Sequence, residues 1–464
     1  MSITATDLND LARDVAAELG VVGAQIALLH RGTIHEGVAG IADLQTGARV
    51  IPDTSFQVGS TTKVHTAALF MQLVEEGQVG LDVPVAEQLP GFVLSDAEAL
   101  ESLTPRHLMS MSSGIDNGPY TDYGAGDDAL TRYVADLAEI PHVFPPGEGY
   151  GYSNASTCVT GRLIEHVTGR TWEAALRERL LEPARLERSG TYPDEIPSGP
   201  LAGGHVVDEA GDWVPLQEPL ALGRSLGPAG GTLYSTAGDL ARFAHLFLHG
   251  GVAVDGTRVL QPDTIARMEE RQVAVPPTLV AEWWGLGPYG KTWDGIPVVG
   301  HSGTNSGGSS YLLWAVEREI AVATVVNTPR LGYPFAARIF RELFGSVAGV
   351  EVPMMPAPPL DFEVPTGRLV GRYEMCGWTF DISSDGGKIS ISGVSDHPPA
   401  PHEIQPSELV PLGPTTFLTT DPAVDGGRGW GLAFIGPEDS PATNLINGFF
   451  NLRRTGDSRV ALAT

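Results

Sequence analysis

Residues 56–77 read FQVGSTTKVHTAALFMQLVEEG, an apolar stretch with a serine and a lysine near its start. The pattern predicts a helix from about Ser60 to Glu76 that stops at Gly77, since glycine commonly ends helices. The residues that follow Lys63 are largely apolar, so we expect the helix to be buried at the centre of the fold. Ser60 and Lys63 are three residues apart and therefore lie one turn from each other on the same face.

The two side chains of this pair suit nucleophilic catalysis. A serine hydroxyl is a poor nucleophile until a neighbouring base accepts its proton. Burial disfavours the charged ammonium of Lys63 and lowers its pKa towards the range of a useful base. Ser60 at a helix N-terminus would also have backbone N–H groups facing a developing oxyanion. The Ser-x-x-Lys pattern is short and matches by chance, and a solvated surface lysine is the alternative interpretation.

Length and composition set broad limits. A chain of 464 residues exceeds the size of most single cores and predicts two domains. A net charge of −27 disfavours nucleic acid and anionic membranes as partners. No apolar run approaches the ~20 residues that span a bilayer, and the first residues do not resemble a secretory signal, so a cytoplasmic protein is expected.

The two cysteines, Cys158 and Cys376, are far apart in the sequence. We expect them to be small buried residues rather than a disulfide or a metal site. No cysteine or histidine cluster has the spacing of zinc ligands, so the sequence indicates neither a metal nor a cofactor.

Hydrophobic periodicity outlines the first 350 residues as an α+β domain. Strand-like segments lie near both ends of this region with helices between them, which favours one antiparallel sheet flanked by helices and assembled from distant segments. Strands are expected at 22–29, 33–42, 309–316 and 320–327, and helices at 4–19, 155–168, 236–249 and 334–345.

The composition and the hydrophobic pattern of the chain change near residue 350. Prolines concentrate between residues 352 and 365, which is typical of an extended linker. Beyond it, short strand-like segments alternate with turn signals, and helical periodicity is absent from 368 onwards. We therefore expect a catalytic domain at 1–350, a linker at 351–366 and a small all-β barrel at 367–464.

Two further motifs carry functional groups. Tyr152-Ser153-Asn154 supplies a hydroxyl that can shuttle a proton and an amide that can hold a substrate carbonyl, although a turn with an Asn N-cap is the plain alternative. His301-Ser302-Gly303, followed by Thr304, supplies small residues that let the backbone approach a ligand, although it equally fits a Gly-rich turn.

The three motifs, in this order, resemble a known family: the class C β-lactamases, the D-alanyl-D-alanine peptidases and their esterase, D-aminopeptidase and transacylase relatives. The resemblance covers nearly the whole chain and implies a β-lactamase/transpeptidase-like fold with an all-helical subdomain. The tail that begins Gly371-Arg372-Tyr373-Glu374 resembles the lipocalin-like barrel of many such enzymes. Further matching segments are 56–59, 80–82, 108–115, 161–169, 228–239 and 284–287.

The resemblance implies a role for each matching residue. Ser60 would form the acyl-enzyme, and Lys63 and Tyr152 would share acid and base duty. Asn154 would contact the substrate amide. The backbone N–H groups of Ser60 and Thr304 would form the oxyanion hole.

The third motif departs from the classical pattern, because His301 stands where β-lactamases and many peptidases have lysine. His301 is expected among the catalytic residues, and Ser302, Gly303 and Thr304 among those that bind substrate. A mostly neutral histidine holds a carboxylate less strongly than lysine does. The His-x-Gly form resembles the D-aminopeptidase, esterase and transacylase branches, which puts efficient β-lactam hydrolysis in doubt.

We therefore expect a serine hydrolase acting on a small amide, peptide or ester, with oligomeric state open. An acyltransferase that passes the acyl group to an amine or alcohol is the alternative, and a non-catalytic binding protein is a third reading. Trp283, Trp284, Tyr289 and Trp293 could line the cleft or simply pack in the core. The Gly-rich loop 421–431 could cap the cleft or form a surface hairpin.

Overall fold

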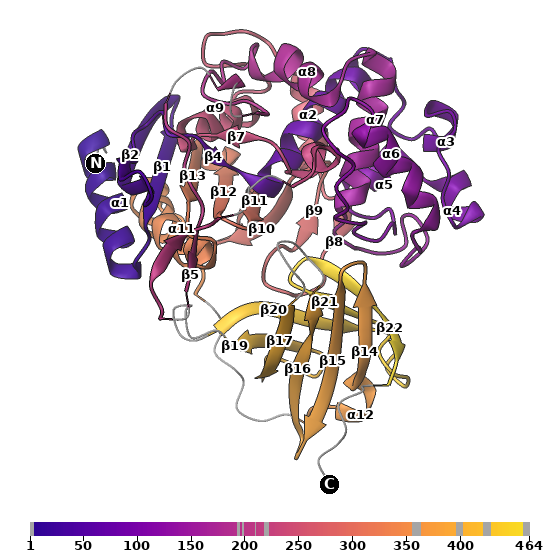
Figure 1. Ribbon diagram of the computed structural model, residues 1–464. Coiled ribbons are helices and arrows are strands. Elements are labelled where there is room, and N and C mark those ends of the chain that lie inside the picture. The colour runs from indigo at the N-terminus through magenta and orange to yellow at the C-terminus, as the bar shows by residue number, and fades with distance from the viewer. Residues whose placement is uncertain are drawn as a thin grey trace.

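The computed structural model describes residues 4–192, 195–196, 199–208, 210–217, 222–354, 363–395, 402–420 and 428–457. A large α+β part carries a smaller all-β part at its lower edge (Figure 1). In the described residues, no helix is both long and apolar enough to cross a membrane.

A nine-stranded antiparallel sheet forms the centre of the α+β part. The expected strands are confirmed: β1 and β2 come from the start of the chain, and β12 and β13 come from near residue 320. β1 pairs with β13, for example through Ala27 and Ala323, so the two distant segments close the sheet together. In sheet order the strands are β3 (Ala48–Arg49), β2 (Thr33–Asp43), β1 (Gly23–His30), β13 (Ile320–Val326), β12 (Gly308–Ala315), β11 (Ile296–Asn305), β10 (Tyr289–Trp293), β9 (Trp283–Trp284) and β8 (Val273–Ala274).

Helices cover both faces of this sheet. α1 (Ala5–Leu19) and α11 (Gly332–Leu343) pack together on one face, and α9 (Ala237–Leu248) packs on the other. Successive side chains of the central strands point to opposite faces of the sheet. Leu28 packs on the face covered by α1, and Leu29 packs on the face covered by α9. These three helices lie close to their expected positions.

A helical region occupies one side of the α+β part (Figure 1). Between residues 58 and 192 the chain forms helices and loops but no strand. This confirms the all-helical subdomain implied by the resemblance. Its helices are α2 (Thr62–Glu75), α3 (Val85–Gln88), α4 (Ala97–Ser102), α5 (Pro105–Met109), α6 (Ala129–Asp136), α7 (Asn154–Thr168) and α8 (Trp172–Leu176).

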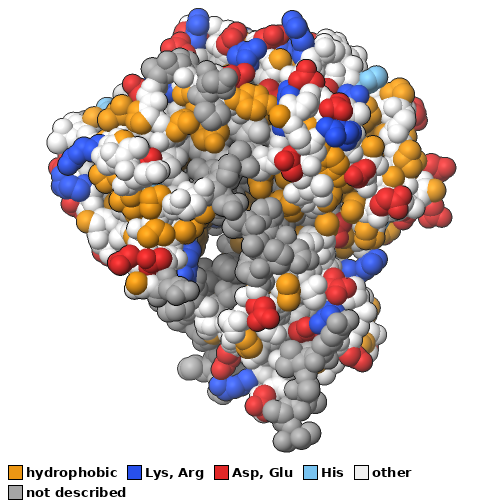
Figure 2. Space-filling model, viewed as in Figure 1, with side chains coloured by type: hydrophobic (Ala, Val, Ile, Leu, Met, Phe, Trp, Pro, Cys, Tyr) orange, Lys and Arg blue, Asp and Glu red, His pale blue; other side chains and the backbone are white. Residues whose placement is uncertain are grey.

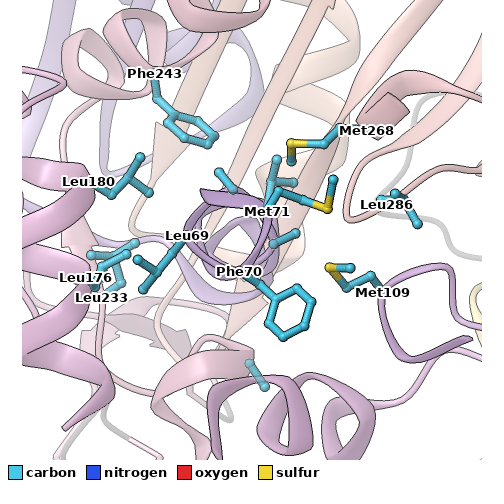
Figure 3. Packing of buried hydrophobic residues seen from close by; sticks show 14 of the residues in the cluster. Leu69, Phe70, Met71, Met109, Leu176, Leu180, Leu233, Phe243, Met268 and Leu286 are labelled. Atoms are coloured by element: carbon cyan, nitrogen blue, oxygen red, sulfur yellow. The ribbon is translucent and has the colours of Figure 1, made fainter. Parts of the chain in front are cut away.

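Helix α2 is the central element of the main core. Every residue from Thr62 to Leu73 is buried, as the apolar sequence predicts. Figure 3 views this helix nearly along its axis, with Leu69, Phe70 and Met71 pointing outward in different directions into hydrophobic neighbours. A helix packed on all sides has little freedom to shift, so it holds its first turn in a fixed place.

The remaining short elements link these layers. β4 (Phe56–Gln57) pairs with β7 (Tyr234–Ser235) just before α2, and α10 (Pro262–Glu269) precedes β8. β5 (His205–Val207) and β6 (Trp213–Pro215) form a separate hairpin.

The second part is a nearly closed nine-stranded antiparallel barrel with its own hydrophobic core, which confirms the expected all-β fold. The Ser407 and Thr420 hydroxyls, from strands near opposite edges of the barrel sheet, hydrogen-bond at 2.7 Å. Half of the expected linker, residues 355–362, lies outside the described residues, so the domain boundaries remain a prediction. After α12 (Thr366–Leu369), the strands are β14 (Gly371–Met375), β15 (Trp378–Asp385), β16 (Lys388–Ser395), β17 (His402–Glu408), β18 (Val410–Pro411), β19 (Thr416–Thr420), β20 (Arg428–Ile435), β21 (Asn444–Asn447) and β22 (Phe450–Gly456).

Acidic and basic side chains are interspersed over the face seen in Figure 2. The excess of acidic residues, 56 against 29 basic ones, is therefore spread over a mixed surface on this face.

Candidate active site

Ser60 lies at the start of the central helix, in a single 3-10 turn (Gly59–Thr61) that leads into α2. The α-helix thus begins at Thr62, two residues later than the sequence predicts. The tighter turn is closed by the Thr62 hydroxyl, which donates to the Gly59 carbonyl at 2.7 Å. Val58 and Thr61 are fully buried while Ser60 is partly exposed, so the serine is accessible in this turn.

The amine of Lys63 lies beside that hydroxyl. Lys63 is 1% exposed, and its Nζ lies 3.2 Å from Ser60 Oγ, 2.6 Å from Asn154 Oδ1 and 2.6 Å from the Ala229 carbonyl oxygen. Burial lowers the pKa of Lys63 to about 7. A neutral amine has two N–H groups and one lone pair. The Asn154 Oδ1 and the Ala229 carbonyl oxygen can only accept hydrogen bonds, so they take the two N–H groups. The lone pair of the amine is then left to accept from the Ser60 hydroxyl.

Tyr152 completes the surroundings of the serine. Its hydroxyl lies close to the Ser60 side chain, and its ring centroid lies 4.7 Å from Lys63 Nζ. Burial raises the pKa of Tyr152 well above its ordinary value, so the phenol stays protonated. A protonated phenol can donate a proton, and the catalytic role expected for Tyr152 remains a prediction.

Asn154 begins α7, where the Ser153 hydroxyl caps the helix by accepting from the Ser156 N–H. The Asn154 side chain is already held by protein groups. Its Oδ1 accepts from Lys63, and its Nδ2 donates to the Tyr120 hydroxyl at 2.9 Å. Asn154 therefore orients the lysine, and its expected contact with substrate remains a prediction.

Strand β11 carries the third motif directly against the nucleophile. A Cβ on Gly303 would lie 2.0 Å from the Val58 carbonyl oxygen and 2.7 Å from the Ser60 nitrogen, so only glycine fits. A Cβ on Gly59 would similarly lie 3.0 Å from the Thr304 nitrogen. The structure thus brings together the two backbone segments expected to supply oxyanion donors.

The side chain of His301, the first residue of the third motif, is fully buried. Its Nδ1 lies 2.6 Å from the Ser302 carbonyl oxygen, which can only accept, so Nδ1 carries the proton. Burial lowers the pKa of His301 to about 3. The buried Nε2 has no hydrogen-bond partner among the described residues. His301 is thus neutral, as the sequence analysis expected, and presents no positive charge to a substrate.

The four aromatic residues that precede His301 in the sequence pack in different places. Trp284 and Tyr289 pack around His301, with ring centroids 5.5 and 5.6 Å away. Trp293 packs against Phe344 in the core, and Trp283 lies under the Arg271 guanidinium at 3.9 Å. Trp284 and Tyr289 thus lie beside the site, and the other two have packing roles.

Sequence reasoning missed three contributors to the site. The Ala229 carbonyl accepts from Lys63, and the Tyr120 hydroxyl holds Asn154. Phe449, from the barrel, stacks on Tyr152 with ring centroids 5.6 Å apart. A backbone carbonyl leaves no signal in a sequence, and neither aromatic residue belongs to a recognisable motif. Of the loop 421–431, residues 421–427 lie outside the described residues.

Within the described ranges, no group of three or more His, Cys, Asp and Glu side chains could hold a metal ion. Neither cysteine forms a disulfide; Cys158 is fully buried, as expected, and Cys376 is only partly buried.

The fold and this site define a serine hydrolase. The chain belongs to the beta-lactamase family, since residues 8–344 match the family model described as Beta-lactamase. It is 38% identical over 360 residues to penicillin-binding protein 4 of Amycolatopsis lactamdurans, covering 77% of this chain and 94% of that protein. It is 28% identical to esterase EstB of Burkholderia gladioli, covering 67% and 86% of the two chains.

Similarity to solved structures extends through the barrel. The crystal structure of SurE is 26% identical, with a TM-score of 0.77, and the match covers 97% of this chain and 99% of SurE. A second structure, of SurE with D-Leu, matches with a TM-score of 0.74.

Proposed function

We propose that this enzyme cleaves a small amide, peptide or ester through an acyl-enzyme on Ser60. The observation that carries the proposal is the buried Lys63 amine, with a pKa of about 7, at 3.2 Å from the Ser60 hydroxyl. A neutral amine at that place is a general base for the nucleophile at ordinary pH. The penicillin-binding protein and esterase relatives support the same reaction class.

The acylation step follows from the contacts. Lys63 accepts the Ser60 proton as Oγ bonds to the donor's carbonyl carbon, and the backbone N–H groups of Ser60 and Thr304 stabilise the resulting oxyanion. The tetrahedral intermediate then collapses: the bond to the leaving amine or alcohol breaks, and Tyr152 passes that group the proton held on Lys63. Water resolves the ester in the second half-reaction, which regenerates Ser60.

The surroundings of the serine support a proposal for the substrate. His301 supplies no positive charge, so the proposed site does not select a carboxylate as a lysine would. Trp284 and Tyr289 give this side an apolar character. SurE, with D-Leu in one of its structures, supports an apolar aminoacyl group as the acyl portion.

The direct test is covalent trapping of the nucleophile. The protein is incubated with an activated ester or a fluorophosphonate, and its intact mass and a peptide map are recorded. We expect one adduct, on Ser60, and none in Ser60→Ala, whereas Ser102→Ala, at an exposed helix end, labels normally. A Ser60 that stays unmodified under forcing conditions would leave the non-catalytic interpretation standing.

The same assay identifies the acyl acceptor. Water as acceptor gives the free acid, and an added amine or alcohol that captures the acyl group gives a product of different mass. We expect the acid to predominate. Exclusive transfer at saturating amine would assign the enzyme to the acyltransferases instead.

A further inference from the structure

We propose that the β21–β22 hairpin of the barrel positions the catalytic Tyr152, with Phe449 as the principal positioning residue. The inference rests on the proposed function, because it concerns how Tyr152 is aimed at Ser60. It gives the barrel a specific role in the reaction that the catalytic domain carries out.

The hairpin reaches into the neighbourhood of the nucleophile. Asn447 pairs with Phe450, so Gly448 and Phe449 form the tip of a two-residue turn. The barrel residues Ala433 and Ile446 belong to the same buried cluster as Tyr152 and Trp284. The barrel is therefore packed onto the active site by a continuous apolar contact.

Aromatic rings from both parts of the molecule enclose Tyr152. Phe449 stacks on the Tyr152 ring at 5.6 Å with an interplanar angle of 22°. Phe450 meets the ring edge-on at 5.4 Å and 89°, and Trp284 contacts it at 5.7 Å and 64°. Two of these three rings come from the barrel hairpin.

Hydrogen bonds fix the backbone at the same place. The Tyr152 N–H donates to the Phe449 carbonyl oxygen at 3.4 Å. Asn451 Nδ2 donates to the Tyr150 carbonyl oxygen at 2.7 Å, and Asn451 Oδ1 accepts from Asn444 at 2.9 Å. The barrel thus holds the backbone of the Tyr152 motif as well as its ring.

The consequence for catalysis is geometric. The Tyr152 hydroxyl lies at the far end of a rigid ring, so a small rotation of that ring moves it away from the Ser60 side chain. Displacements of about 1 Å at reacting groups cost on the order of 10²-fold in rate. Without Phe449, one face of the ring would lose its packing and the hydroxyl its fixed direction. Phe449 acts through Tyr152, which separates it from a residue that merely contacts substrate.

A double-mutant cycle tests this separation. Phe449→Ala is measured in the wild-type background and in the Tyr152→Phe background, with an activated ester and an amide as donors. In the wild type we expect kcat to fall roughly 10- to 100-fold with KM changed less than about threefold. In Tyr152→Phe we expect Phe449→Ala to cost less than about twofold more, because the hydroxyl it positions is already gone.

Controls separate positioning from folding. Phe449→Tyr, which keeps the stacked ring, is expected to restore most of kcat. Val394→Ala, at an exposed barrel position, is expected to change nothing. If Phe449→Ala does not fold, Phe449→Leu carries the same cycle, with Tm recorded for every variant.

The outcomes are distinct. Equal losses in both backgrounds, or a loss confined to KM, would overturn the positioning role. If Tyr152→Phe alone retains full activity, the role of Tyr152 in the proposed function fails first, and the positioning proposal falls with it. If Ser60 still forms an adduct in that case, the acyl-enzyme itself stands.

Discussion

The backbone N–H of Cys376 points at the carboxylate of Asp116, at 3.1 Å from Oδ1 and 3.2 Å from Oδ2. Cys376 lies in the barrel turn between β14 and β15, and Asp116 lies in the loop against which the Tyr152 motif packs. The Asp116 carbonyl accepts from the Ser153 hydroxyl at 3.0 Å. One buried residue thus joins the barrel to the residue that follows Tyr152.

Removing this carboxylate should loosen the barrel. We expect Asp116→Ala to lower the free energy of unfolding by about 1–3 kcal/mol, because the Cys376 and Asn117 N–H groups lose their acceptor. Thermal unfolding and limited proteolysis measure the change. Asp116→Asn keeps an acceptor oxygen and should lose less, and Asp385→Ala, at an exposed barrel turn, should have no effect. Equal stability of Asp116→Ala and wild type would contradict the prediction.

The pH dependence of acylation should follow Lys63. The neutral amine is the active form, so kcat/KM is expected to rise about tenfold per pH unit below about 7 and to level off above it. The profile is measured from pH 5 to 9 with an activated ester. Lys63→Arg should lose roughly 10²–10⁴-fold, since a guanidinium does not deprotonate. Lys291→Ala removes a second lysine whose pKa burial lowers, to about 8, and should keep the wild-type midpoint.

His301 should not titrate in the same pH range. With its pKa lowered to about 3, it carries no charge between pH 5 and 8. The ratio of kcat/KM for a carboxylate-bearing donor to that for its methyl ester is therefore expected to be constant across this range. A ratio that grows as the pH falls would show that His301 becomes a cation. His301→Gln, neutral at every pH, is the matched control.

Gly303 should not tolerate a side chain. A methyl group there would meet the Val58 carbonyl oxygen and the Ser60 nitrogen, so Gly303→Ala should displace β11 from the nucleophile. We expect a loss of roughly 10²-fold or more in kcat, comparable with the removal of an oxyanion donor. Gly345→Ala, where no atom lies within 4 Å of the added methyl, is the matched control and should retain full activity.

Glu269 should make stability depend on pH. Burial raises its pKa from 4.5 to about 7, although the Trp314 indole N–H donates to it at 2.5 Å. Between these two values the folded protein binds more protons than the unfolded chain, so stability falls as pH rises from about 4.5 through about 7. Glu165 has the same shift and adds to the trend.

Thermal unfolding between pH 5 and 8 measures this effect. Glu269→Gln is expected to show a smaller decrease in Tm with rising pH than the wild type. Glu270→Gln, at the exposed neighbouring position, should leave the slope as it is. An unchanged slope in Glu269→Gln would mean that the buried carboxyl is ionised throughout.

Much of the α+β part could be predicted because its signals are local. The apolar run after Lys63 predicts a buried helix, and the segments at 309–316 and 320–327 form the paired strands β12 and β13. The start of α2 is displaced by two residues, because the 3-10 turn at Ser60 depends on the Thr62 hydroxyl and the close approach of Gly303. Contacts between residues far apart in the sequence produce no hydrophobic periodicity, so the sequence does not predict them.

The predicted site residues include the groups gathered around Ser60, but the groups that hold them come from elsewhere. Tyr120 lies in a loop without a pattern, and Ala229 contributes only its backbone. Phe449 belongs to a short strand pair that resembles any barrel hairpin, so nothing local indicates that it packs on the other part of the molecule. A barrel side chain that supports the site can be identified only from a structure that contains both the barrel and the α+β part.

The hairpin that encloses Tyr152 also sets an order of events during synthesis. β22 pairs with both β14 and β21, so Phe449 takes its place only once the barrel strands have assembled. A ribosome-bound chain with a complete catalytic domain would still lack the rings that hold Tyr152. Full activity would then begin only after the barrel has been made and has folded, and a nascent chain would not turn over substrate at full rate before that point.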